Sequence, residues 1–249
     1  MHKHLKAKLF DGKEGKVGHI LETHFRALKE FAHMQWLKIK YFGIGGYNAK
    51  KYWRDRLSHY GTSLKGVGNK YQTEQQNKES YEQAKKTFLS LCKKEKMDFS
   101  SIRFLDVGCG AGFYAQLFSE NGGRNYTGVD ITDSLFATLR AKFSRFHFIR
   151  LDVTEQPLPG IFDVIIMIDV TQHITNTEKF SYAMQNIGNH LGEGGVFIVT
   201  SWLKGDIKRG FYEVSRSLQR YKREFPGYAF SDPLPFRDKF LFLIRKDNH

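Results

Sequence analysis

The residues best suited to chemistry surround a short glycine-rich segment, FLDVGCGAG, at positions 104–112 of the 249-residue chain. An apolar stretch leads into Gly108, Gly110 and Gly112, and a helical pattern follows them. Glycines let the backbone turn tightly and let a ligand approach the main chain without interference from a Cβ atom. The start of a helix also offers free N–H groups. This arrangement predicts a binding site for a nucleotide-type cofactor.

The charge beside these glycines bears on which ligand fits. The dinucleotide fingerprint is G-x-G-x-x-G, whereas this segment reads G-x-G-x-G and carries Asp106 two residues before the first glycine. A carboxylate at this point disfavours a pyrophosphate and favours a cationic ligand, such as a sulfonium that also carries an ammonium group.

Two further carboxylates follow the next two predicted strands. Asp130 comes after the strand predicted over 126–129, where it is well placed to accept hydrogen bonds from both ribose hydroxyls. Asp152 follows the strand predicted over 146–151, where it can accept a hydrogen bond from an adenine amino group. The alternative interpretations are a helix N-cap or loop carboxylate for Asp130 and a surface turn for Asp152.

Short apolar strands alternate with amphipathic helices around these residues. We predict strands over 102–107, 126–129, 146–151, 162–168, 196–200 and 240–244, and helices over 114–120 and 133–143. A capping-box spacing at Thr175 and Glu178 opens another helix, which Gly192, Gly194 and Gly195 end. This alternation predicts right-handed βαβ units and a doubly wound, mostly parallel α/β sheet covered on both faces.

The part of the chain before this core is predicted to be helical and basic. Apolar residues fall at helical spacing over 20–41, and further helices are predicted over 48–62 and 75–95. A basic amphipathic helix over 20–41 can lie on a membrane, but we favour packing on its own domain. We therefore divide the chain into a partly helical N-terminal extension, 1–47, and a domain, 48–249. That domain has a cofactor core at 100–202 and an acceptor-side insert at 203–238.

Composition excludes some classes of protein. The chain is 41% hydrophobic and 26% charged, as expected for a globular protein. No apolar stretch is long enough to span a bilayer, and no apolar run follows the basic residues at its start, which argues against a secretory signal. The spacing of the two cysteines, Cys92 and Cys109, makes no metal motif. We expect no metal site and a reducing, cytoplasmic setting.

The net charge of +13 is concentrated in the flanks. Residues 1–60 hold thirteen Lys/Arg against five Asp/Glu and residues 203–249 hold eleven against six, whereas residues 100–202 hold seven against ten. Basic flanks attract an anionic partner, such as a nucleic acid, a phosphorylated metabolite or a membrane surface. They are equally consistent with a solvated surface that keeps the protein soluble.

Five motifs in order resemble the class I S-adenosylmethionine-dependent methyltransferases. They are LDVGCGAG at 105–112, YTGVD at 126–130, RLDV at 150–153, FDVIIMIDVTQHI at 162–174 and LGEGGVF at 191–197. The resemblance covers about two-fifths of the chain and implies the Rossmann-like methyltransferase fold, with a seven-stranded sheet and S-adenosylmethionine as cofactor.

The resemblance also implies roles for individual residues. The glycine segment surrounds the methionine portion of the cofactor, Asp130 holds the ribose, and Asp152 with the Val153 amide reads the adenine edge. Ile168 and Asp169 lie beside the amino-acid end and the reacting methyl. The candidate cofactor residues in this core are Asp106, Gly108, Cys109, Gly110, Gly112, Phe113, Asp130, Ile131, Asp152, Val153 and Ile168.

An upstream helix adds two candidate cofactor residues. Trp53 and Arg56 resemble the aromatic and basic residues that many small-molecule methyltransferases place over the cofactor, so Arg56 would pair with the methionine carboxylate. The alternative for Arg56 is a surface arginine without a specific partner.

Two residues after the fourth core strand are candidates for catalysis. His173 is the best candidate for a general base, because imidazole titrates near neutrality and the site lies near the ligand-binding edge of the sheet. The alternative is that it braces its loop by hydrogen bonding. Asp169 is the second candidate, although we prefer a contact between it and the cofactor amino group.

We therefore expect methyl transfer to an oxygen or nitrogen atom of a small molecule, such as an anionic, natural-product, sugar or lipid-linked acceptor. The Asn-Pro-Pro-Tyr type of motif that base-methylating enzymes of the family carry after the fourth strand is replaced by Asp-Val-Thr-Gln at 169–172. Three alternatives stay open, namely an RNA methyltransferase that uses the basic flanks, a non-catalytic cofactor-binding subunit, and a transferase that moves a different group from a sulfonium. The sequence does not indicate an oligomeric state.

Overall fold

The computed structural model describes residues 24–25, 28–29, 31–43, 46–69 and 71–246, which belong to two compact units, 1–48 and 49–249. In the first unit the described residues 24–25, 28–29 and 31–41 are helical, and the antiparallel strands β1 (Phe42–Gly43) and β2 (Gly46–Tyr47) follow. The remainder of the helix predicted over 20–41 lies outside the described residues. None of the described helices is both long and apolar enough to cross a membrane.

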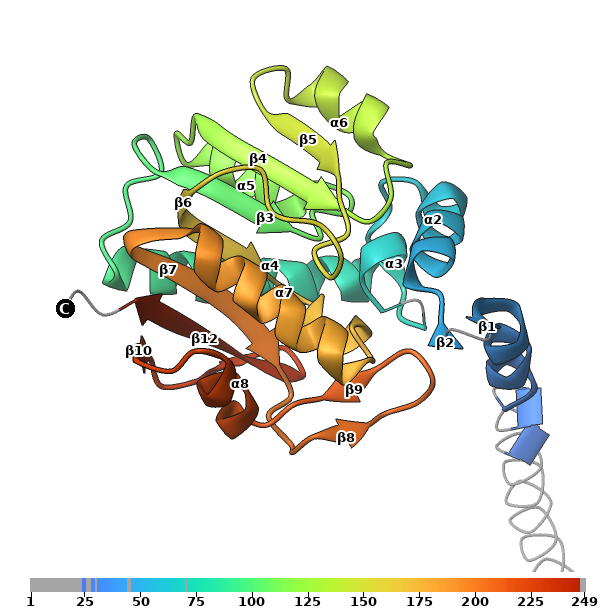
Figure 1. The fold of residues 1–249 in the computed structure, drawn as a ribbon. Helices are drawn as coiled ribbons and strands as arrows, with labels where there is room; N and C mark the ends of the chain where they lie inside the picture. Colours follow the sequence, from blue (N-terminus) through green and yellow to red (C-terminus); the bar gives the residue numbers. More distant parts are fainter. Residues whose placement is uncertain (1–23, 26–27, 30, 44–45, 70, 247–249) are drawn as a thin grey trace, which may run out of the picture. The chain divides into compact units, whose positions relative to one another are not determined.

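The second unit is built on a sheet of eight strands in the order β10-β12-β7-β6-β3-β4-β5, with β11 added beside β12 (Figure 1). The strands are β3 (Arg103–Val107), β4 (Asn125–Asp130), β5 (His147–Arg150), β6 (Phe162–Met167), β7 (Leu191–Ser201), β10 (Tyr228–Phe230), β11 (Leu234–Phe236) and β12 (Lys239–Lys246). The expected seven-stranded, mostly parallel sheet is thus confirmed in type and extended by one short strand, because the chain folds back as a hairpin before β12.

The order of the strands fixes where a ligand can bind. The chain runs from β3 outward through β4 to β5, and then returns to the other side of β3 to form β6. Ligands of open α/β sheets bind at such a switch point, at the carboxyl ends of the strands. In this protein that position lies after Val107 of β3 and Met167 of β6.

Helices cover both faces of the sheet (Figure 1). Apolar side chains of α4 (Glu74–Lys94), α5 (Phe113–Glu120) and α6 (Phe136–Lys142) form one buried cluster with the sheet, and those of α7 (Thr177–His190) and α8 (Leu218–Glu224) form another. Residues that alternate along one strand, such as Phe104 and Leu105, belong to opposite clusters. This is the arrangement expected of a sheet that is buried on both faces.

Two details of the region after β6 differ from the sequence prediction. The N-cap of α7 is Asn176, whose side chain accepts a hydrogen bond from the Lys179 amide, so the expected capping box at Thr175 and Glu178 is wrong by one residue. The glycines after this helix lie within β7 instead of ending the helix in a loop. A register shift beside Phe162 accommodates them in the sheet.

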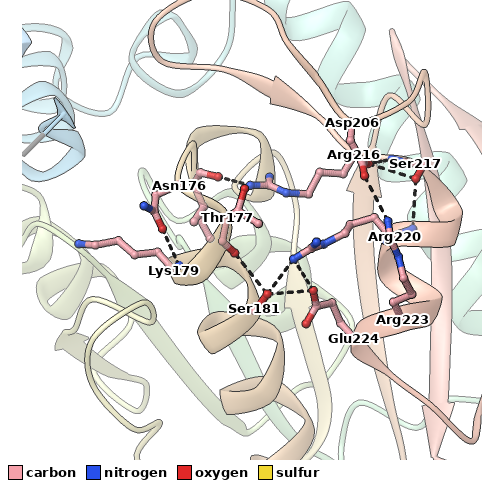
Figure 2. A network of polar contacts seen from close by, with 11 residues as sticks. Asn176, Thr177, Lys179, Ser181, Asp206, Arg216, Ser217, Arg220, Arg223 and Glu224 are labelled. Atoms are coloured by element: carbon pink, nitrogen blue, oxygen red, sulfur yellow. Dashed lines mark hydrogen bonds and ion pairs between the residues drawn. The ribbon is translucent and has the colours of Figure 1, made fainter.

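The region over 203–238 holds the short sheet of β8 (Ile207–Lys208) and β9 (Val214–Ser215) as well as α8, β10 and β11. Figure 2 shows how polar contacts anchor it to α7: Arg220 Nη2 donates to Ser181 Oγ at 2.7 Å and pairs with Glu224. The buried Arg216 donates to the carbonyl oxygens of Thr171 and Ile174, the residues that begin and follow the short helix η1 (Thr171–His173).

Asn186 of α7 fastens the loop that follows β5. Its side chain accepts from the Leu158 amide at 3.1 Å and donates to the carbonyl oxygens of Val153 and Gln156 at 3.1 and 2.7 Å. We expect Asn186→Ala to lower the free energy of unfolding by about 3 kcal/mol, because it leaves buried backbone groups without partners. Urea denaturation tests this, with Gln185→Ala on the exposed side of the same helix as control. Equal stability of the two variants would contradict it.

Candidate functional site

The glycine segment turns sharply between β3 and α5. Gly108, Gly110 and Gly112 have φ values of 82°, 49° and 77°, in the left-handed region that favours glycine. A Cβ atom on Gly110 would lie 2.8 Å from Val67 Cγ1, and one on Gly108 would clash with the Val170 side chain. All three glycines are therefore needed for the conformation of the backbone, as the sequence predicted.

A hydrogen bond joins this segment to the end of β4. Asp130 Oδ2 accepts from the Gly110 amide at 3.0 Å, and Asp130 Oδ1 accepts from the Thr132 amide at 3.1 Å. Asp106 lies on the neighbouring strand β3, where it accepts a hydrogen bond from the Tyr126 hydroxyl at 2.7 Å. The fold thus brings two acidic residues that are far apart in the sequence to one side of the glycine segment.

These two carboxylates are buried without a compensating cation. Asp106 is 2% exposed and Asp130 is 8% exposed, and no basic side chain among the described residues forms an ion pair with either. Burial raises the pKa of Asp106 to about 7 and the pKa of Asp130 to about 6. Two acids held in this way favour a ligand that brings positive charge or hydrogen-bond donors.

The predicted adenine contacts lie on the loop that Asn186 fastens. Asp152 Oδ1 accepts from the amide and the hydroxyl of Thr154, at 2.9 and 2.6 Å. These bonds are those of a local turn, which was the alternative interpretation of Asp152. They occupy one carboxylate oxygen, and no described residue donates to the other. Val153 is buried beside it.

The helices α2 (Ala49–Tyr60) and α3 (Leu64–Val67) precede the core, and α2 carries Trp53 and Arg56. Arg56 donates through Nη2 to the carbonyl oxygens of Lys65 and Gly68, at 2.9 and 2.6 Å, and through Nη1 to the Tyr52 hydroxyl at 3.1 Å. Its buried Nε–H has no acceptor among the described residues. Arg56 therefore joins α2 to the segment that packs on Gly110, and its buried Nε–H is still available as a donor.

His173 lies in an aromatic setting at the end of η1. Its ring packs against Trp53 at 4.9 Å and is parallel to that of Tyr212 at 6.0 Å. Nδ1 lies 3.1 Å from the Tyr212 carbonyl oxygen, which can only accept, so Nδ1 carries the hydrogen and Nε2 the lone pair. Burial lowers the pKa of His173 to about 3, so the ring is neutral at neutral pH.

Asp169 comes directly after β6 with a φ of 59°, a strained value for a residue other than glycine. Its amide donates to Thr200 Oγ1 at 2.8 Å. Its carboxylate pairs with Arg237, and its Oδ1 lies 3.1 Å from Lys239 Nζ. The structure thus places His173 and Asp169 on one short segment at the switch point.

The remaining predicted cofactor residues flank this site. Cys109 is buried with its side chain toward Gly128, so its thiol faces the sheet. Phe113 begins α5 and its ring contacts Tyr81 at 4.8 Å. Ile131 follows Asp130 directly, and Ile168 belongs to the buried cluster under the site. No group of three or more His, Cys, Asp or Glu residues in the described part of the chain could hold a metal ion.

Sequence reasoning missed Arg237 and Lys239, which contact Asp169 from a distance of about 70 residues along the chain. The sequence did contain a feature that could have identified these two residues. Arg237 lies just before the last strand and Lys239 begins it, and an antiparallel last strand begins at the edge where its parallel neighbours end.

Known proteins resemble part of this chain. Residues 104–195 match the family model described as a methyltransferase domain. The ubiquinone biosynthesis O-methyltransferase of Rickettsia typhi is 28% identical over 108 residues, which are 42% of this chain and 42% of that protein. The chain thus matches less than half the length of this curated relative.

Two solved structures have a similar fold. An S-adenosylmethionine-dependent methyltransferase from Clostridium acetobutylicum aligns with a TM-score of 0.55 and 16% identity, over 68% of this chain and 92% of that one. The N-methyltransferase NodS from Bradyrhizobium japonicum, in complex with S-adenosylhomocysteine, aligns with a TM-score of 0.51 and 15% identity, over 59% and 79%. At these identities the likeness concerns the fold. Residues 104–195 therefore form a methyltransferase domain, and the fold of the second unit is that of S-adenosylmethionine-dependent methyltransferases.

Proposed function

We propose that this protein is an S-adenosylmethionine-dependent methyltransferase that acts on an oxygen or nitrogen atom of a small molecule. The observation that carries the proposal is the pair of buried carboxylates, Asp106 and Asp130, beside a glycine segment with no compensating cation among the described residues. A pyrophosphate would meet two buried acids there, whereas a sulfonium with an ammonium group supplies the missing positive charge.

The residues present fit this cofactor. Asp130 would accept hydrogen bonds from the ribose hydroxyls, and the free oxygen of Asp152, with the Val153 amide, would read the adenine edge. The methionine portion would lie beside the glycine segment, whose amides are close to Asp130. The unpartnered Nε–H of Arg56 is a donor for the methionine carboxylate, and Asp169 is an acceptor for its ammonium group.

Methyl transfer from a sulfonium is an in-line displacement, and the cofactor supplies the electrophilic methyl. The protein must align the acceptor with the methyl group, exclude water and manage the acceptor proton. Trp53 and Tyr212 pack on the ring of His173 and shield part of it from water. A ring with a pKa of about 3 holds a proton poorly, so we infer that His173 Nε2 accepts a hydrogen bond that orients the acceptor.

The relatives are compatible with either acceptor atom. The Rickettsia protein is by its name an O-methyltransferase, and NodS is an N-methyltransferase. The aromatic residues beside His173 favour a small acceptor over a polynucleotide, which would need an open basic groove.

The proposal is tested by calorimetry with S-adenosylhomocysteine and by a transfer assay with labelled cofactor and a panel of small molecules, RNA and protein. We expect wild-type protein to bind the ligand and to label small molecules. Asp130→Asn should bind about 30-fold more weakly, because a charged acceptor worth about 2 kcal/mol is lost. Asp133→Asn, an exposed acid of the same loop, is the control. Binding of a dinucleotide instead, or labelling of RNA alone, would contradict the proposal.

The buried state of His173 predicts how stability depends on pH. The pKa of its ring is lowered from 6.5 to about 3 in the folded protein, so acidification below pH 6.5 protonates the unfolded chain first and destabilises the fold. We expect the stability advantage of wild-type protein over His173→Asn to shrink by about 2 kcal/mol between pH 7.5 and pH 5.

Urea denaturation at both pH values measures this difference, with His147→Asn at an exposed position as control. A difference that does not change with pH would mean that the imidazole titrates freely in the folded protein. It would then favour His173 as a general base.

A further inference from the structure

Basic side chains gather on the acceptor side of Asp169, and the cofactor does not account for them. Arg237 and Lys239 pair with Asp169. Lys239 Nζ lies 4.7 Å from the centroid of the Trp202 ring, and the Arg209 guanidinium lies 4.5 Å from the same centroid. Trp202 follows β7 directly, so this group lies at the carboxyl edge of the sheet, next to the proposed reaction centre.

The hairpin of β11 and β12 is shaped to present two of these cations. Phe236 pairs with Lys239, so Arg237 and Asp238 form a two-residue turn. Arg237 has a φ of 54°, a conformation that costs energy in a residue other than glycine or asparagine. Since β12 runs antiparallel to β7, this turn lies where the parallel strands end. The turn therefore places its basic side chains over the site and not on the outer surface.

These cations are held with little water around them. The side chain of Lys239 is 9% exposed and that of Arg237 is 12% exposed. Arg237 lies over the ring of Tyr81 at 4.9 Å, and its Nε–H has no acceptor among the described residues. Taking charged groups out of water is costly unless a partner compensates for the loss. This unsatisfied donor on a buried arginine is available to an added acceptor.

The acids in the neighbourhood are either shared between these cations or exposed to water. Asp169 is shared by both Arg237 and Lys239. Asp238 accepts from Trp202 Nε1 at 2.8 Å and pairs with Lys239, but its side chain is 64% exposed. If Asp169 turns to the ammonium group of the cofactor, Arg237 and Lys239 lose the carboxylate that they share, and an oxyanion would replace it.

We propose that Arg237, Lys239 and Arg209 bind an oxyanion of the methyl acceptor, a carboxylate or a phosphate, and hold the acceptor beside Trp202. This inference rests on the proposed function, because it assigns the chemical class of the substrate of that same site. It also assigns a role in acceptor binding to the region over 203–239. This region carries Arg209 and ends in the hairpin of β11 and β12, which carries Arg237 and Lys239. Neutral analogues of the acceptor would lose these contacts.

The test is calorimetry with two simple anions, inorganic phosphate and benzoate, titrated into the full chain with and without saturating S-adenosylhomocysteine. We expect at least one of them to bind wild-type protein saturably. Lys239→Gln should weaken that binding at least about tenfold, because a charge-assisted contact is lost. Arg209→Gln, at an exposed position, should weaken it about threefold. Lys208→Gln, its exposed neighbour, is the matched control and should bind as wild type does.

The outcomes separate the two proposals. Phosphate binding alone identifies a phosphorylated acceptor, and benzoate binding alone a carboxylated one. If neither anion binds, or if Lys239→Gln and Arg209→Gln bind as tightly as wild type, the inference is overturned while the methyltransferase assignment stands. If the variants also lose affinity for S-adenosylhomocysteine, the cations belong to the cofactor site, and the inference is again overturned. Failure of wild-type protein to bind S-adenosylhomocysteine would instead remove the proposed function.

Discussion

The burial of two acids without a cation is the constraint on which this structure depends. Asp106 and Asp130 sit at the switch point of the sheet, and desolvation raises the pKa of both. A protein pays for such an arrangement in stability, because each charged acid would prefer water. A ligand that supplies the opposite charge would offset this loss of stability. The glycine segment, held to Asp130 through the Gly110 amide, is the surface on which such a ligand would lie.

The rest of the domain holds Asp106 and Asp130 and the loops around them in position. Parallel strands β3, β4 and β6 bring their carboxyl ends together, so acids from separate motifs become neighbours. Asn186 secures the loop on the predicted adenine side, and Arg216 secures η1 on the other. On the acceptor side the charge is of the opposite sign, because the last hairpin brings Arg237 and Lys239 to Asp169. A cofactor with a positive centre and an anionic acceptor would suit these two halves.

Much of the fold and of the cofactor side of the site was predictable from the sequence, because both follow from local apolar patterns and from the order of the motifs. The strands, the glycine turn and the placement of Asp130 follow from apolar runs that end in glycine or acid. The exact cap of α7 was not predictable, since Thr175 and Asn176 are both good caps and only tertiary contacts choose between them. The same holds for Arg237 and Lys239, whose role depends on a strand pairing between distant segments. The burial that makes His173 a neutral ring also depends on partners, Trp53 and Tyr212, from other parts of the chain.

The most direct test of the account is the number of protons released when S-adenosylmethionine binds at pH 6.5. Calorimetry in buffers of different ionisation enthalpy measures it. A cationic ligand beside Asp106 and Asp130 should favour their charged forms, so the account predicts release of about 0.5 to 1 proton per site. That release should largely disappear in a double variant with asparagine at both positions. Uptake of protons, or binding with no change in protonation, would contradict the claim that the buried carboxylates of Asp106 and Asp130 form the binding site of a positively charged cofactor.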